Sequence, residues 1–306
     1  MGNKEGKPSK DKNYLLQTCD EHEGSINCMD LSDDGSVLVT GGDDGTIRLW
    51  TAKSDVVECL GILEGHEEYI TSVSIEDNFV ISTSADMTIK KWNISTCECL
   101  ITFKGHESTV NKIVCTGDFL FSVSYDKKAR CWDFDTGECV RVFSGHKNNI
   151  SSILYIPADT EIQTDALHLI QMAKKKLAQQ GNKLPPLSNA IDHFQDEEEN
   201  MYSKDLIITG SLDSSAKSWS IETGECVHTF KGHTGPVTCL ATDQKGRILF
   251  TGSSDHTIRS WDIMTGQLLK VFTGHQTTVL SLTVKQFDFF LNFLYIFTKK
   301  YSIQKF

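Results

Sequence analysis

Residues 105–133 read GHESTVNKIVCTGDFLFSVSYDKKARCWD, and this stretch decides the fold. His106 stands near its start and Trp132 near its end, with Ser122 ten residues and Asp126 six residues before the tryptophan. The same four residue types recur at matching positions four more times along the 306-residue chain. The five histidine-to-tryptophan intervals are 28, 26, 26, 73 and 28 residues. A unit of about 40 residues therefore repeats along the chain, with one interruption.

Each repeat contains a histidine, a hydroxyl residue, an aspartate and a tryptophan, which together we call a quartet. The five quartets are His22, Thr40, Asp44 and Trp50; His66, Ser82, Asp86 and Trp92; His106, Ser122, Asp126 and Trp132; His146, Thr209, Asp213 and Trp219; and His233, Thr251, Asp255 and Trp261. A hydroxyl, an imidazole and a carboxylate can form a hydrolytic triad. An enzyme needs one such site, whereas this chain carries five in register. We therefore predict that the quartets are structural and that the chain has no catalytic residues.

The segments between the quartet residues have the character of short strands. Phe79–Ser82 and Leu206–Thr209 are apolar and rich in β-branched residues, and turn formers such as Asp43-Asp44-Gly45 and Asp135-Thr136-Gly137 separate such runs. Short strands at regular spacing predict an all-β fold. One unit forms a four-stranded sheet that cannot bury both of its faces, so neighbouring units must stack.

In these features the chain resembles the WD-repeat family from about residue 13 to about residue 285. Gly-His pairs open five units, and Trp132-Asp133 and Trp261-Asp262 close two of them. The resemblance implies a β-propeller with five complete four-stranded blades and an incomplete sixth. It also implies a polar chain in each quartet, from the indole N–H through the hydroxyl and the imidazole to the carboxylate. The expected propeller spans residues 13–284, with units at 22–63, 66–103, 106–143, 146–230 and 233–272 and a partial unit at 275–284.

Composition restricts the function further. A net charge of −11 and a pI near 5.4 argue against nucleic acid as a partner, because phosphate binding needs a basic face. Cys59, Cys99, Cys139 and Cys226 recur at one position of the repeat, which predicts buried structural thiols. The sequence has no pair of Cys-x-x-Cys motifs, so we expect neither a metal site nor a cofactor.

The resemblance places partner-binding positions three and five residues after each quartet histidine and one residue before each quartet aspartate. These positions lie on loops at one rim, the top face. Aromatic and amide groups there suit a protein or peptide partner. The candidate partner-binding residues are Tyr69, Tyr125, Asn27, Asp43, Asn111, Asn149, Leu212 and Pro236.

The expected function is a non-catalytic scaffold for protein–protein interaction in the cytoplasm, with the nucleus as an alternative location. A second hypothesis is a substrate receptor of a ubiquitin ligase, as in many WD-repeat proteins. Against it, too few residues precede His22 for an F-box, and no arginine stands two positions after Trp132-Asp133 or Trp261-Asp262. A third hypothesis is a truncated product with no independent function.

Three segments fall outside the repeat. Residues 1–12 form a polar, lysine-rich leader that we expect to be disordered, and residues 157–204 interrupt the fourth unit with a predicted helix at 165–180. Residues 285–306 form an aromatic tail, which is too short and interrupted to span a bilayer and does not alternate as a half-exposed strand should. The sixth unit should therefore contribute only its inner strand. We expect an unclosed ring that self-associates through its open blades.

Overall fold

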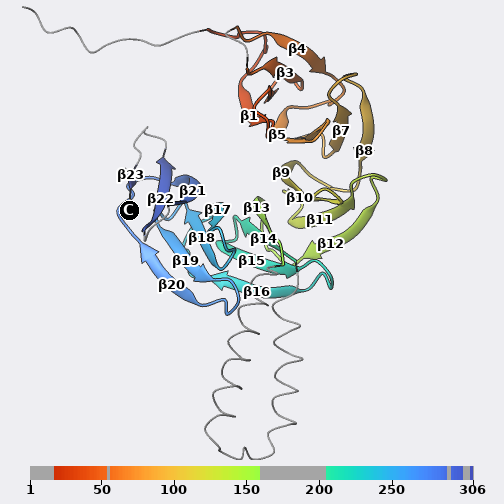
Figure 1. Cartoon of the computed structure of the whole chain (residues 1–306). Helices are drawn as coiled ribbons and strands as arrows, with labels where there is room; N and C mark the ends of the chain where they lie inside the picture. Colours follow the sequence, from red (N-terminus) through yellow and green to blue (C-terminus); the bar gives the residue numbers. More distant parts are fainter. Residues whose placement is uncertain (1–16, 54–55, 159–204, 288–290, 299–303, 306) are drawn as a thin grey trace, which may run out of the picture.

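The computed structural model describes residues 17–53, 56–158, 205–287, 291–298 and 304–305. Within these ranges every regular element is a β-strand, and the strands form six antiparallel sheets (Figure 1). Five sheets have four strands and the last has three. The all-β prediction and the five complete four-stranded blades are confirmed.

The blades follow one another in chain order, and each blade runs from its inner to its outer strand. Blade 1 comprises β1 (Ile26–Leu31), β2 (Val37–Gly42), β3 (Ile47–Thr51) and β4 (Cys59–Leu63); blade 2 comprises β5 (Ile70–Glu76), β6 (Phe79–Ser84), β7 (Ile89–Asn93) and β8 (Cys99–Phe103); blade 3 comprises β9 (Val110–Cys115), β10 (Phe119–Ser124), β11 (Lys128–Asp133) and β12 (Cys139–Ser144). Blade 4 comprises β13 (Ile150–Ile156), β14 (Leu206–Ser211), β15 (Ser215–Ser220) and β16 (Cys226–Lys231); blade 5 comprises β17 (Val237–Thr242), β18 (Ile248–Ser253), β19 (Ile258–Asp262) and β20 (Leu268–Phe272); blade 6 comprises β21 (Val279–Phe287), β22 (Leu291–Thr298) and β23 (Gln304–Lys305).

The hydrophobic core lies between blades. One cluster joins Val39 and Leu63 of blade 1 to Ile70 and Trp92 of blade 2, and four further clusters also join neighbouring blades. Burying both faces of each sheet requires a neighbour on both sides, as the repeat predicts.

The six blades lie along an arc, and the first and the last do not lie side by side (Figure 1). The inner strand β1 shows the consequence. Ile26 is 47% exposed and Met29 is 66% exposed, whereas the equivalent residues of blades 2 to 6 are at most 8% exposed. The face of blade 1 turned away from blade 2 therefore meets solvent.

The C-terminal tail corrects a prediction. We expected residues 285–306 to add no strand to the sixth unit, but β21 extends to Phe287 and pairs with β22 from Val279↔Thr298 to Phe287↔Leu291. A short strand, β23, pairs with β22 in turn. Aromatic and β-branched residues favour extended backbone whether or not they alternate with polar ones. Alternation predicts only strands with one solvated face, so its absence did not exclude a sheet.

Two other predictions fall mostly outside the described residues. The leader at 1–12 lies outside them, and so does the insertion at 157–204 with its predicted helix, except for residues 157 and 158. The strands on either side of the insertion, β13 and β14, pair from Ile150↔Ser211 to Ile156↔Leu206. The interruption therefore leaves the fourth blade's sheet intact. No helix within the described residues could cross a membrane.

Candidate functional site

The structure brings the four side chains of every quartet together. The Trp indole N–H donates to the Ser or Thr hydroxyl at 2.8–2.9 Å. That hydroxyl lies 2.7–2.9 Å from His Nε2, and His Nδ1 lies 2.6–2.8 Å from the Asp carboxylate. A neutral imidazole protonated on Nδ1 satisfies all these bonds, because it donates to the carboxylate and accepts the hydroxyl proton.

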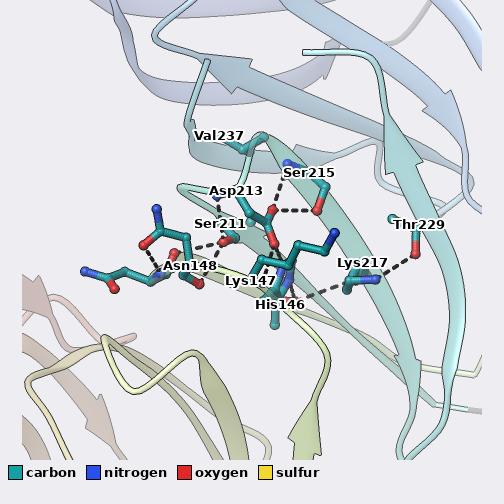
Figure 2. A network of polar contacts seen from close by, with 12 residues as sticks. His146, Lys147, Asn148, Ser211, Asp213, Ser215, Lys217, Thr229 and Val237 are labelled. Carbon is teal, nitrogen blue, oxygen red and sulfur yellow. Dashed lines mark hydrogen bonds and ion pairs between the residues drawn. The ribbon is translucent and has the colours of Figure 1, made fainter. Parts of the chain in front are cut away.

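Each quartet connects two loops of one blade. The histidine lies in the loop that enters the inner strand, and the aspartate lies in the turn after the second strand. The second carboxylate oxygen of Asp213 holds that turn, since it accepts bonds from the Ser215 backbone N–H and hydroxyl (Figure 2). The backbone N–H of Lys147, next to His146, donates to Asp213 Oδ2 at 2.9 Å. The polar chain therefore holds both loops to the sheet.

Burial and hydrogen bonding set the charge states of the quartet. Burial lowers the pKa of His106, His146 and His233, which favours the neutral imidazole. Burial acts in the opposite direction on Asp213, but bonds from Ser215, the Lys147 backbone and His146 outweigh it and lower the pKa of Asp213 to about 2. The hydroxyls of Ser82, Ser122, Thr209 and Thr251 belong to residues with no exposed surface. A substrate cannot reach these hydroxyls in the folded protein.

A second repeated contact joins one blade to the next. The residue five positions after each quartet histidine donates a side-chain hydrogen bond to the carbonyl of the first residue of the following inner strand. We call these contacts latches. They run from Asn27 to Ile70, Thr71 to Val110, Asn111 to Ile150, Ser151 to Val237 and Thr238 to Val279.

The side chains of two candidate residues form latches. Asn27 and Asn111 were predicted to bind a partner, but their amide groups donate to Ile70 and Ile150, at 3.0 Å and 2.6 Å. Asn27 also donates to Asp43, so the Asp43 carboxylate is engaged as well. Sequence spacing could not show that the neighbouring blade already uses the polar groups of these two residues.

The remaining candidates lie on paired top loops. In blades 2 to 5, the backbone N–H of the residue before the quartet aspartate donates to the carbonyl of the residue three positions after the quartet histidine. This bond joins Ala85 to Tyr69, Tyr125 to Thr109, Leu212 to Asn149 and Ser254 to Pro236. Asn149, Leu212 and Pro236 are partly buried. Tyr69 and Tyr125 are 41% and 42% exposed. The two tyrosines, on blades 2 and 3, are the most accessible of the candidates in these four loop pairs.

Sequence reasoning missed a third large side chain on this face. Met87 directly follows the quartet aspartate of blade 2 and is 45% exposed. Its backbone is left-handed, with φ of 69°, as it is at the same position of the other complete blades. The turn that carries Met87 is joined to the loop that carries Tyr69 by the Ala85 backbone N–H, which donates to the Tyr69 carbonyl. The position after the aspartate was the signal that could have revealed it.

The outer-strand cysteines also correct a prediction. Cys99, Cys139 and Cys226 are exposed and Cys59 is partly exposed, although all four were expected to be buried. They begin the outer strands, where their side chains lie at the sheet edge and not between blades. Repetition alone therefore did not indicate burial. On the inner strands, Cys239 is buried and Cys28 is partly buried, and burial raises their pKa to about 11 and about 12.

An open pocket of about 400 Å³ lies on blade 2, beside the top face. It is lined by the loops of the quartet residues and by one face of the β7–β8 hairpin, including Glu67, Met87, Lys90 and Lys104. Within the described residues no group of histidine, cysteine and acidic side chains is arranged to hold a metal.

Comparison with known proteins agrees with this geometry. The model of the WD domain, G-beta repeat, matches residues 13–51, 57–93, 97–133 and 224–262. The chain belongs to the WD-repeat family.

Human WD repeat-containing protein 86 is 44% identical over 236 residues, which cover 77% of this chain. The chain spans 54% of that relative, about half of its length. Mitochondrial division protein 1 of Neurospora crassa is 31% identical over 81 residues, 26% of this chain and 12% of that protein. Among solved structures, the computationally designed Ika8 protein superposes with a TM-score of 0.68 at 25% identity, covering 93% of this chain and 71% of the designed one.

Proposed function

We propose that this chain is a non-catalytic scaffold that binds a protein or peptide through the top face of blades 2 and 3. One observation carries the proposal. Among the described residues, the large apolar side chains that are exposed on the top loops are Tyr69, Met87 and Tyr125, and they occur on two adjacent blades. Tyrosine and methionine are enriched where proteins bind partners, because they provide contact area with adaptable packing.

The quartets support the absence of catalysis. Their hydroxyls are buried and bonded on both sides, to the indole and to the imidazole. A nucleophile must instead meet its substrate, and a catalytic site occurs once and not in every repeat. The quartets fix the loops that present the tyrosines and Met87.

Affinity capture of the intact chain, compared with the double variant Tyr69→Ala/Tyr125→Ala, tests the proposal. Truncating an aromatic hot spot of an interface costs about 2 kcal/mol or more, so specific partners should be lost from the double variant. Leu100→Ala/Val140→Ala is the matched control, because these side chains are 48% and 51% exposed on the outer strands of the same two blades. An unchanged set of partners in the tyrosine variant, or the same loss in the control, would reject the top face as the binding surface.

A further inference from the structure

The residues that line the blade 2 pocket have counterparts at the equivalent positions of blade 4, and one acidic residue of blade 2 is replaced there by a lysine. In blade 2 the pocket is lined by Glu67 after the quartet histidine, by Lys90 and Thr102 on the hairpin, and by Lys104 before the next Gly-His pair. At the corresponding positions blade 4 has Lys147, Lys217, Thr229 and Lys231. We call this set, together with Ser214 and Ser215, the blade 4 recess, because it occupies the positions equivalent to those that line the blade 2 pocket.

Strand register places the hairpin residues of the recess on one face. Lys217 is paired with Thr229, and Ser215 is paired with Lys231. Directly opposed residues of an antiparallel pair, and residues two apart on one strand, project to the same side of the sheet. The Lys217 ammonium donates to the Thr229 hydroxyl at 2.8 Å, which holds it over this face. Blade 2 repeats this contact between Lys90 and Thr102 at 3.0 Å.

The loop residue Lys147 lies beside this face. Its backbone N–H donates to Asp213 Oδ2, and Asp213 also binds Ser215. Figure 2 shows Lys147, Ser215, Lys217 and Thr229 grouped around Asp213 and His146. Lys147 and Lys231 are exposed, and no carboxylate of the described residues forms an ion pair with any of the three lysines.

The positive charge of the recess is particular to blade 4. Blades 1, 2 and 3 have glutamate at the position of Lys147, namely Glu23, Glu67 and Glu107, and blade 5 has Thr234. In blade 3 that glutamate pairs with Lys128, and in blade 1 Glu21 pairs with Arg48. In blade 2 the two lysines of the pocket are balanced by Glu67 and Asp86. Blade 4 has three lysines at these positions and one aspartate, whose oxygens are already bound by His146, Ser215 and the Lys147 backbone.

We propose that the blade 4 recess binds a phosphorylated side chain of a protein partner. Phosphate carries close to two negative charges and three acceptor oxygens, which match three ammonium groups with the Thr229 hydroxyl beside Lys217. A carboxylate offers one charge and two acceptor oxygens, so it compensates fewer of the three ammonium groups than a phosphate does. The proposal rests on the proposed function only in taking a protein as the carrier of the phosphate.

Two other carriers of phosphate fit the molecule less well. A membrane surface and a nucleic acid present many phosphates over a wide area, and the net charge of −11 opposes both. A single phosphate on a peptide is small enough to interact mainly with the lysines of the recess and not with the negative charge of the whole protein.

Binding of fluorescent degenerate peptides to the intact chain tests the proposal, with a central residue fixed as phosphoserine, serine or glutamate. We expect phosphoserine peptides to bind at least about tenfold more tightly than serine peptides. Lys147→Glu, which gives blade 4 the blade 2 residue, and Lys217→Gln should each weaken phosphoserine binding at least about tenfold. Lys90→Gln in blade 2 is the matched control and should leave binding unchanged. Thermal unfolding of each variant verifies that it folds.

A gain-of-function variant makes the test sharper. Glu67→Lys gives blade 2 the same three lysines, and we expect it to raise the number of phosphoserine peptides bound per chain from one toward two. Equal binding of phosphoserine and serine peptides, an equal loss in Lys90→Gln, or binding only to phosphatidylserine vesicles would overturn the proposal. Tyr69→Ala/Tyr125→Ala should keep the phosphoserine binding, so the two proposals fail separately.

Discussion

The Asn111 amide of blade 3 donates a hydrogen bond to the carbonyl oxygen of Ile150, the first residue of the inner strand of blade 4, at 2.6 Å. Ile150 has no exposed surface, so this carbonyl is shielded from water on its own blade. The latches at Asn27, Thr71, Ser151 and Thr238 repeat the contact along the arc. Neighbouring blades are thus joined by hydrogen bonds as well as by the apolar clusters. Each of blades 1 to 5 contributes one short polar side chain to these bonds.

Removing a latch should lower stability by a predictable amount. Asn111→Ala leaves the Ile150 carbonyl without its donor, and we expect the free energy of unfolding to fall by about 1–3 kcal/mol. Asn149→Ala is the control, because Asn149 is also partly buried on a top loop but forms no latch. Urea denaturation of both variants measures the difference. Equal losses would show that the latch adds nothing to the fold.

Removing a quartet histidine should cost more. His106→Ala leaves the Ser122 hydroxyl and the Asp126 carboxylate without their main partner, in a site where both are buried or partly buried. Unsatisfied buried groups cost about 1–3 kcal/mol each, so we expect a loss of about 3 kcal/mol and a single cooperative transition.

The exposed histidine of blade 5 provides the control for this change. His256 lies outside any quartet, and His256→Ala should leave the melting temperature nearly unchanged. If His106→Ala melted with the parent chain, the quartet would have no structural role and another function for it would have to be sought.

Acid should destabilise the protein in two stages. The pKa values of His106, His146 and His233 are lowered by burial, so the unfolded chain binds protons more readily than the folded one below about pH 6.5. Above that pH the three histidines are neutral in both states and do not destabilise the fold. As the pH falls toward their pKa values in the folded protein, stability is lost. Each histidine contributes up to about 1.4 kcal/mol per pH unit in that interval.

The second stage belongs to the aspartates. The pKa of Asp213 and that of Asp44 are both lowered to about 2, so their contribution is lost between about pH 4 and pH 2. Melting temperatures from pH 8 to about pH 2 measure both stages. A melting temperature that stayed constant from pH 7 to pH 5 would contradict the histidine stage.

The sequence predicted this architecture because the repeat is dictated by local chemistry. Trp132 and Ser122 stand ten residues apart in the chain, and β10 and β11 pair so that the indole reaches the hydroxyl. Strand order and quartet geometry follow from such spacing. The latch from Asn111 depends on a neighbouring blade, and the exposure of Cys139 depends on the position of the sheet edge. Neither can be predicted from one repeat alone.

The tail was mispredicted for a related reason. Period-two alternation indicates a strand with one face in water, and residues 291–298 lack it. Their pairing with β21 depends on backbone hydrogen bonds, which do not require alternation. An apolar strand without alternation can be recognised only once its position in the fold is known.

The uncovered face of blade 1 should control self-association. Ile26, Met29 and Leu31 are exposed on β1, whereas Val73, which is equivalent to Met29, is 7% exposed on β5. Neighbouring apolar side chains in water favour association, at roughly 25 cal/mol for each Å² buried. Met29→Lys should therefore reduce oligomers in sedimentation velocity without lowering the melting temperature. Val73→Lys is the matched contrast: it places an unpaired charge between blades and should destabilise the fold by several kcal/mol. If Met29→Lys left the oligomers unchanged, association would have to use another surface. If it destabilised the chain as strongly as Val73→Lys, the face of blade 1 would be covered in solution, and the arc would be closed there.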